Sequence, residues 1–232
     1  MITLRPSEAR GHVKIAWLDS RHSFSFGRYY DPQEMNWGAL RVINEDWIEP
    51  DAGFNPHGHS DMEILTYVLQ GALEHKDSTG GGSVLRPGEV QLMSAGRGIT
   101  HSEFNPSLTE RTHLLQIWVE PNRTGLEPGY QQHAIPGGLT PGGLKVLTSP
   151  DGRDGSLRMV QDAVIYAGSL EGEQQIEYPM NSQRRAYVHL ARGAMTLNAQ
   201  PMKTGDGAKI AGESLLTFSE GQGAEFLLFD LP

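Results

Sequence analysis

Short apolar runs separated by Gly and Pro are the feature that most constrains the fold of this chain. Each run has the length of a β-strand, and none keeps a 3.6-residue apolar period over three turns. Turn-forming sequences such as Ser78-Thr-Gly-Gly-Gly82 and Arg86-Pro-Gly88 lie between the runs. The pattern predicts an all-β sandwich or barrel. The predicted strands are 13–18, 39–43, 63–69, 90–93, 113–119, 144–147, 186–190, 194–197, 214–218 and 225–229.

A weak internal repeat indicates two copies of one module. Its pieces occur in the same order in both halves: residues 67–75 resemble 188–196, residues 86–92 resemble 203–209, and residues 113–118 resemble 224–229. We therefore expect two antiparallel β-barrel (jelly-roll) modules, over residues 1–135 and 136–232. The Pro/Gly-rich residues 121–143 are the expected connection.

Two pairs of polar residues have the spacing of one strand face. His57 and His59 form the first pair, and His101 and Glu103 form the second. Side chains at i and i+2 of a strand point the same way, about 6.6 Å apart along the strand. Two facing pairs would make a metal site of three histidines and one carboxylate. The second half of the chain has only His189, so we expect the metal in the first module.

Other residues near these pairs compete for the fourth ligand position. Glu63 and Asp61 share the parity of His57 and His59 if the strand runs straight. His75 and His113 are better suited to supporting roles than to ligation. The remaining histidines have no second ligand-type residue at strand spacing, so we expect no metal-binding role for them. They are His12, His22, His133 and His189. The four tryptophans are expected in the core.

Composition narrows the classes of partner. A net charge of −9, spread along the chain, would repel a phosphate backbone, so we expect no direct nucleic-acid binding. No apolar run approaches the roughly 18–20 residues that span a bilayer, and no signal peptide is visible, so no membrane association is expected. Zero cysteines exclude disulfides and sulfur ligands. We expect a cytoplasmic protein, with a monomer slightly favoured.

Two longer motifs resemble the pirin family of the bicupin superfamily, in its bacterial quercetin 2,3-dioxygenase-like branch. Residues 53–71, which contain Asn-Pro-His-Gly-His, look like its first cupin motif, and residues 88–105, which contain Gly-Ile-Thr-His-Ser-Glu-Phe-Asn, look like its second. The resemblance covers the chain and implies the bicupin fold. It also implies a carboxylate ligand from the second motif, which favours Glu103 over Glu63. One departure is Gly58, where many members of the family have Pro.

The resemblance implies a metal-dependent flavonol dioxygenase, of the flavonol 2,4-dioxygenase class, with quercetin and O2 as substrates. His57, His59, His101 and Glu103 would hold one divalent transition-metal ion, with Fe(II) preferred and Mn, Co, Ni, Cu or Zn as alternatives. Glu103 would also accept the substrate proton. Phe54, Met93 and Phe104 flank the ligand motifs and could line a slot for a flat polyphenol. The alternative is a non-catalytic, metal- and redox-sensing regulator that acts through protein partners.

Overall fold

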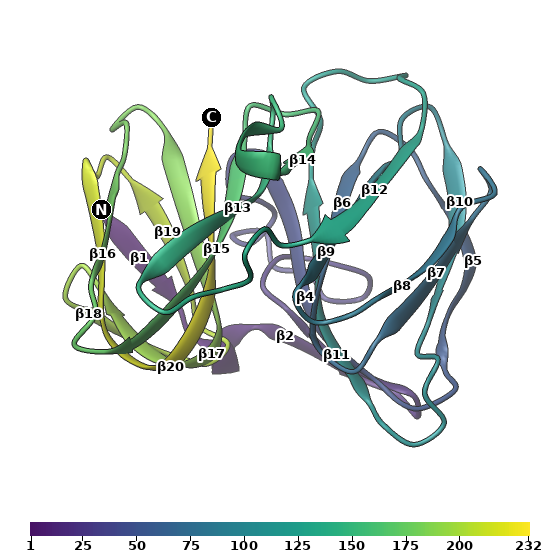
Figure 1. The fold of residues 1–232 in the computed structure, drawn as a ribbon, viewed down its shortest axis with the longest axis horizontal. Helices are drawn as coiled ribbons and strands as arrows, with labels where there is room; N and C mark the ends of the chain where they lie inside the picture. The colour runs from purple at the N-terminus through teal and green to yellow at the C-terminus, as the bar shows by residue number, and fades with distance from the viewer. The chain divides into compact units, whose positions relative to one another are not determined.

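The computed structural model describes residues 1–232 and is almost entirely β-structure, which confirms the predicted fold class. The only helical elements are two single 3₁₀ turns, η1 (Ser7–Ala9) and η2 (Arg153–Gly155). The chain divides into two compact units. We call residues 11–134 with 159–161 the N-terminal unit, and residues 1–10, 135–158 and 162–232 the C-terminal unit (Figure 1).

Two antiparallel sheets build the N-terminal unit (Figure 1). The larger sheet has seven strands in the order β12 (Gly129–Ala134), β9 (Glu89–Ser94), β6 (Glu63–Gln70), β11 (Thr112–Val119), β4 (Leu40–Ile48), β3 (Leu18–His22) and β2 (Gly11–Lys14). The smaller sheet has four strands in the order β5 (Gly53–His59), β10 (Ile99–Phe104), β7 (Leu73–Asp77) and β8 (Gly82–Leu85).

Apolar side chains from both sheets of the N-terminal unit meet in one buried cluster. Ile48, Val68 and Leu114 come from the larger sheet, and Leu73 and Leu85 come from the smaller one. Because successive side chains of a strand alternate between its two faces, only one face of each strand points toward this cluster. The two sheets are therefore packed face to face, as in a jelly roll.

The C-terminal unit is one nine-stranded sheet. Its main path runs β1 (Ile2–Arg5), β19 (Gly207–Ala211), β17 (Arg185–Leu197), β20 (Leu215–Leu231), β15 (Val164–Gly172), β13 (Gly143–Ser149) and β14 (Leu157–Arg158). Two further strands pair off this path: β16 (Ile176–Pro179) with β20, and β18 (Gln200–Lys203) with β17. Every pairing is antiparallel except that of β13 with β14, which is parallel.

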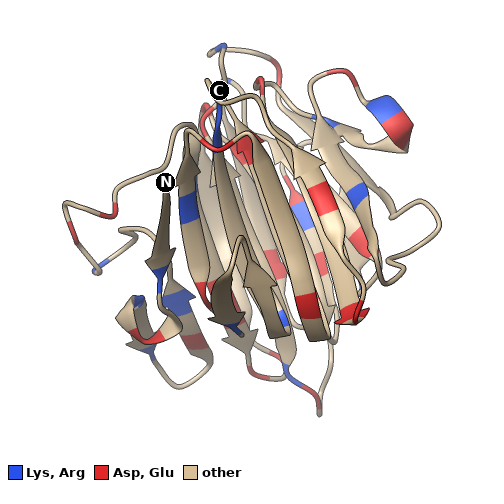
Figure 2. Cartoon of the chain, turned by 90° about the vertical axis from the view of Figure 1, so that its left-hand side faces the viewer, with Lys and Arg blue, Asp and Glu red and all other residues tan.

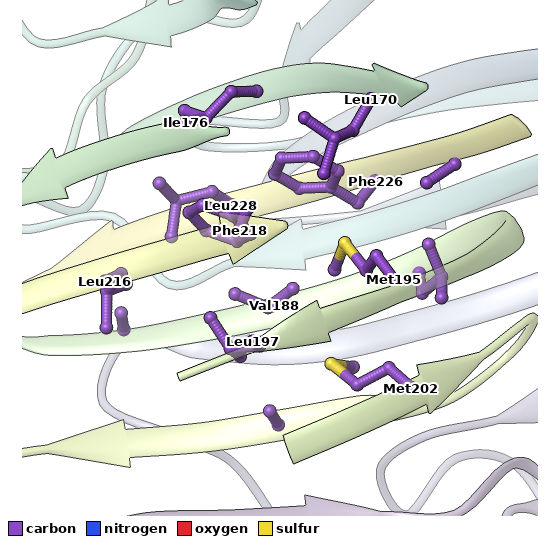
Figure 3. Close-up of a cluster of buried hydrophobic side chains, with 14 of the residues drawn as sticks. Leu170, Ile176, Val188, Met195, Leu197, Met202, Leu216, Phe218, Phe226 and Leu228 are labelled. Atoms are coloured by element: carbon purple, nitrogen blue, oxygen red, sulfur yellow. The ribbon is translucent and has the colours of Figure 1, made fainter. Parts of the chain in front are cut away.

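The interior of the C-terminal unit is filled by apolar side chains (Figure 3). The rings of Phe218 and Phe226 stack with their centroids 4.5 Å apart, and Val188, Leu197 and Leu228 belong to the same cluster. Each such fully buried side chain contributes roughly 1.5–3 kcal/mol to stability. Sixteen buried residues form this single cluster, so the hydrophobic effect is a main source of stability for the C-terminal unit.

Two details of the fold differ from the sequence-based expectations. Residues 1–10 belong to the C-terminal unit, because β1 pairs with the free edge of β19. Part of the expected connection, residues 121–143, is a strand, since β12 pairs with β9 along six residues. The division of the chain into two cupin modules at residue 135 stays a prediction from the sequence.

Charges of both signs are interspersed along the strands and loops of the face drawn in Figure 2. Neither 3₁₀ turn is long or apolar enough to cross a membrane. The expected cytoplasmic location and the expected absence of nucleic-acid binding stay predictions from the sequence.

Candidate metal centre

Two neighbouring strands of the smaller sheet carry the four candidate ligands. His57 and His59 lie on β5, and His101 and Glu103 lie on β10. The two strands pair antiparallel, with His101 opposite His57 and Ile99 opposite His59. Because residues two apart share a face, the three histidines project from the same side of the sheet. The pairing of these strands brings the two motifs side by side.

The three histidine rings lie close together, and two of them, His57 and His59, line a cavity in the N-terminal unit. Nε2 of His101 lies 3.1 Å from Nε2 of His57. The ring centroid of His59 is 4.8 Å from that of His57 and 4.9 Å from that of His101. One nitrogen from each of the three lies within 4.8 Å of the others. His101 is buried, whereas His57 and His59 are half-buried and accessible from the cavity.

The hydrogen bonds of His57 and His101 are compatible with tautomers that carry a lone pair on Nε2 of each ring. Nδ1–H of His57 donates to the carbonyl oxygen of Asn55 over 2.8 Å, which leaves Nε2 unprotonated in the neutral ring. Nε2–H of His75 donates to Asp77 over 3.0 Å, which leaves Nδ1 of His75 as an acceptor for Nδ1–H of His101 and for an amide N–H of Gln91, each over 3.4 Å. In these tautomers, both His57 and His101 present an Nε2 lone pair to the space between them.

Burial keeps these rings neutral. Desolvation lowers the pKa of His59 to about 4 and that of His101 to about 3, with a smaller contribution from the neighbouring histidines. At pH 7 both rings are unprotonated, which is the state in which imidazole binds a metal.

Glu103 is buried on the same face but is displaced from the histidine cluster. A β-bulge between His101 and Glu103 shifts the register, so that Glu103 lies opposite Phe54. Its carboxyl group comes close to ligand atoms of His75 and His101, which form a second group with metal-binding potential. Nε2–H of Gln116 donates to both carboxylate oxygens, over 3.1 and 3.0 Å. Desolvation raises the pKa of Glu103 to about 7.

The alternative ligands have other partners. Glu63 accepts hydrogen bonds from Oγ of Ser94 (2.9 Å) and from the backbone N–H of Val160 (3.1 Å). Asp61 accepts from the backbone N–H of Gly125 over 2.7 Å. His113 contacts Glu45 over 2.9 Å. These contacts hold all three side chains outside the histidine cluster.

Sequence reasoning missed the role that Asp77 has in the geometry of the site. Its side chain accepts from the backbone N–H of Thr79 (2.8 Å) and Gly81 (3.3 Å), and it contacts His75 (3.0 Å). The chain Asp77–His75–His101 is therefore anchored on the turn that follows β7. An Asp two residues after a His on one strand was the only signal available in the sequence.

The cavity has a volume of about 420 Å³ and is mainly apolar. Phe54 lines it as predicted, whereas Met93 is buried in a separate apolar cluster and Phe104 is not among the lining residues. Two tryptophans expected in the core, Trp17 and Trp118, form part of the wall. The full lining is Trp17, Phe26, Asn44, Asp46, Gly53, Phe54, Asn55, His57, His59, Glu103, Gln116 and Trp118.

The donor set fits a divalent transition metal. In the tautomers described above, the lone pairs on Nε2 of His57 and Nε2 of His101 face each other across 3.1 Å, an arrangement that a cation between them would stabilise. Two nitrogens bound to one ion at about 2.1 Å and at right angles to each other would be roughly 3 Å apart. Three neutral imidazoles and one carboxylate suit iron, nickel, copper and related ions.

Comparisons with known proteins show which family the chain resembles. The family model described as pirin matches residues 3–119, and the model described as the quercetinase C-terminal cupin domain matches residues 146–231. The quercetin 2,3-dioxygenase of Escherichia coli K12 is 46% identical over 100% of this chain and 99% of its own length. A pirin-like protein of Caulobacter vibrioides is 39% identical over 99% of each chain.

A solved structure agrees with these sequence relatives. The bacterial pirin YhhW of Escherichia coli, in complex with nickel(II), superposes with a TM-score of 0.95 at 46% identity. The alignment covers 100% of this chain and 99% of that one. The chain is therefore a member of the pirin family.

Proposed function

We propose that this protein is a metal-dependent dioxygenase that cleaves a flavonol such as quercetin with O2. One observation carries the proposal: neutral histidine nitrogens and a buried carboxyl group face an apolar cavity large enough for flat aromatic rings. The name of the Escherichia coli relative, quercetin 2,3-dioxygenase, supports the choice of substrate.

His57, His59, His101 and Glu103 would hold one divalent ion, with Fe(II) preferred and Mn, Co, Ni, Cu or Zn as alternatives. When bound, the ion would supply Lewis acidity that lowers the pKa of the flavonol 3-hydroxyl, and open coordination positions. The bulge in β10 holds Glu103 toward His75, so ligation by Glu103 requires its side chain to turn from the position that Gln116 stabilises.

The chain's own groups bind the substrate and move its proton. The aromatic walls formed by Trp17, Phe54 and Trp118 would bind the flavonol rings and exclude water from them. A carboxylate oxygen of Glu103 would accept the proton of the 3-hydroxyl group. In the overall reaction both atoms of O2 enter the product, the heterocycle opens, and one ring carbon leaves as carbon monoxide.

Replacing one ligand tests the proposal. His59→Ala, reconstituted with each candidate metal, should bind less than one metal ion per chain and lose about 100-fold or more of its quercetin-dependent O2 uptake. His12→Ala is the matched control, because His12 contacts Asp19 on the surface and does not line the cavity. Metal content and carbon monoxide release are measured beside O2 uptake.

Two outcomes would contradict the proposal. Full activity of a metal-free His59→Ala protein would exclude the metal-dependent reaction. Wild-type turnover far below the roughly 1–10³ s⁻¹ of ordinary enzymes, together with a tight protein partner, would instead favour the metal- and redox-sensing regulator.

A further inference from the structure

A second cavity adjoins the first in the N-terminal unit. Its volume is about 370 Å³, and it shares four lining residues with the first cavity: Phe26, Asn44, Asp46 and Phe54. None of the four candidate ligands lines it. A ligand that extends from the first cavity toward the second would therefore contact these shared residues.

Only two residues of the shared wall are polar, Asn44 and Asp46. They differ in how much of their hydrogen-bonding capacity is already used. Oδ1 of Asn44 lies 2.7 Å from Nδ1 of the buried His22. The Asp46 side chain has one hydrogen bond, which Oγ–H of Ser20 donates to its Oδ1. An ionised carboxylate has about four acceptor sites, so Asp46 retains most of its accepting capacity at the wall when it is ionised.

The position of Asp46 is set by the pairing of the strands. Asp46 and Asn44 are two residues apart on β4 and share a face, and Ser20 lies directly opposite Asp46 on β3. Asp46 is 3% exposed, and its neighbours around the cavities include Trp17, Phe26 and Phe54. Burial of an acidic group in such surroundings is costly unless a polar partner satisfies it. A hydroxyl group of a bound ligand would be such a partner.

We propose that Asp46 is a specificity-determining residue that accepts a hydrogen bond from a phenolic hydroxyl group on the pendant ring of the flavonol. The second cavity would receive that ring while the 3-hydroxyl lies near the histidines. This inference rests on the proposed function, because it takes a flavonol as the ligand. The protein would then prefer polyphenols with a hydroxylated pendant ring over those with an unsubstituted one.

Two flavonols that differ in a single hydroxyl group test the inference. Kaempferol has one hydroxyl group on its pendant ring, and galangin has none. Neither has a catechol on that ring that could bind the metal in a reversed orientation. Metal-loaded protein, titrated without O2 and followed by the absorbance of the flavonol, should bind kaempferol roughly 10- to 100-fold more tightly than galangin.

Variants of Asp46 should remove this preference. Asp46→Leu should bring the ratio of the two Kd values close to one. Asp46→Asn keeps a neutral acceptor and should retain a ratio of only about 3- to 10-fold. Glu45→Gln is the matched control, because Glu45 is the adjacent buried acid on β4, does not line either cavity, and points to the other face. Its ratio should equal that of the wild type.

The outcomes separate this inference from the proposed reaction. Equal binding of both flavonols by the wild type, or an unchanged ratio in Asp46→Leu, would overturn the role of Asp46. If Asp46→Leu fails to fold by circular dichroism, Asp46→Asn decides, and a wild-type ratio there would overturn it too. A preference that depends on Asp46 without any turnover in air would support this inference and refute the reaction. Turnover of both flavonols with equal kcat/KM would do the reverse.

Discussion

At the scale of single residues, the position of Glu103 depends on how one amide is oriented. Oγ1–H of Thr66 donates to Oε1 of Gln116 over 2.7 Å, and this turns Nε2–H of Gln116 toward both oxygens of Glu103. If Thr66 were absent, the amide could turn over and present its oxygen to the carboxylate. The sequence could not reveal this relay, because its three members are far apart in the chain.

Thr66→Val should therefore impair the reaction without removing the metal. We expect kcat for quercetin to fall about 3- to 10-fold while the bound metal per chain stays unchanged, since no ligand is altered. Thr112→Val is the matched control, because it removes a buried hydroxyl that donates to the carbonyl oxygen of Ala72, away from the site. Equal kcat values for wild type and Thr66→Val would exclude a role of the relay.

Asp77 should influence metal affinity through His75 and His101. Asp77→Asn weakens acceptance from Nε2–H of His75, and with it the tautomer that leaves Nε2 of His101 free for a metal. We expect the affinity for Ni(II), measured by competition with a chelator, to fall about 10- to 100-fold. Glu74→Gln, in the same strand but partly exposed and paired with Lys76, should leave the affinity unchanged. Equal affinities for the two variants would contradict the relay.

At the scale of strands, the alternation of side chains between the two faces was predictable, but the register in which two strands pair was not. The i, i+2 spacing predicted that His57 and His59 share a face, as do His101 and Glu103, because side-chain direction is a local property of a strand. The bulge in β10 depends on the partner strand, so it could not be predicted. The same limit explains β20, where two predicted strands form one strand that continues, with irregular pairing, past Gly221 and Gly223.

Two glycines of β5 test how closely this strand approaches β10 beside the bulge. A Cβ on Gly53 would lie 2.1 Å from the backbone oxygen of Glu103 and 2.6 Å from Cα of Phe104, whereas a Cβ on Gly58 would meet nothing closer than 3.9 Å. Gly53→Ala should therefore destabilise the protein by about 1–3 kcal/mol in denaturant unfolding. Gly58→Ala should be neutral or stabilise it by up to about 1 kcal/mol. Similar losses from both variants would show that the contact at Gly53 is not decisive.

At the scale of the whole molecule, local repeats predicted two modules but not every partner in them. The repeated pieces share turn and strand patterns, which a sequence displays directly. That β1 joins the C-terminal unit depends on a pairing between residues about two hundred positions apart, which leaves no local signal. The sequence also could not show that Trp17 and Trp118 line a cavity. Both are apolar residues that suit a core, and only the folded chain shows which apolar residues border a cavity.

The buried ionisable groups of the N-terminal unit should also affect the stability of the molecule, with opposite signs. The pKa values of His59 and His101 are lowered on folding, so their unfolded forms bind more protons below about pH 6.5, and stability falls there as the pH falls. Desolvation raises the pKa of Asp46 from 3.8 to about 7, so its contribution is present below about pH 4 and is lost as the pH rises through 7.

Asp46→Asn isolates the contribution of Asp46, because it removes this acid and leaves the histidines and Glu103 in place. In chelator-treated protein, the Tm of Asp46→Asn minus that of the wild type should become more positive between pH 5.5 and pH 8, as the wild type loses the stability of its protonated carboxyl group. Arg111 holds the pKa of Glu49 below its ordinary value, so Glu49→Gln should give a difference in Tm that is constant over the same range. A constant difference for Asp46→Asn as well would mean that Asp46 is already ionised in the folded protein at pH 5.5.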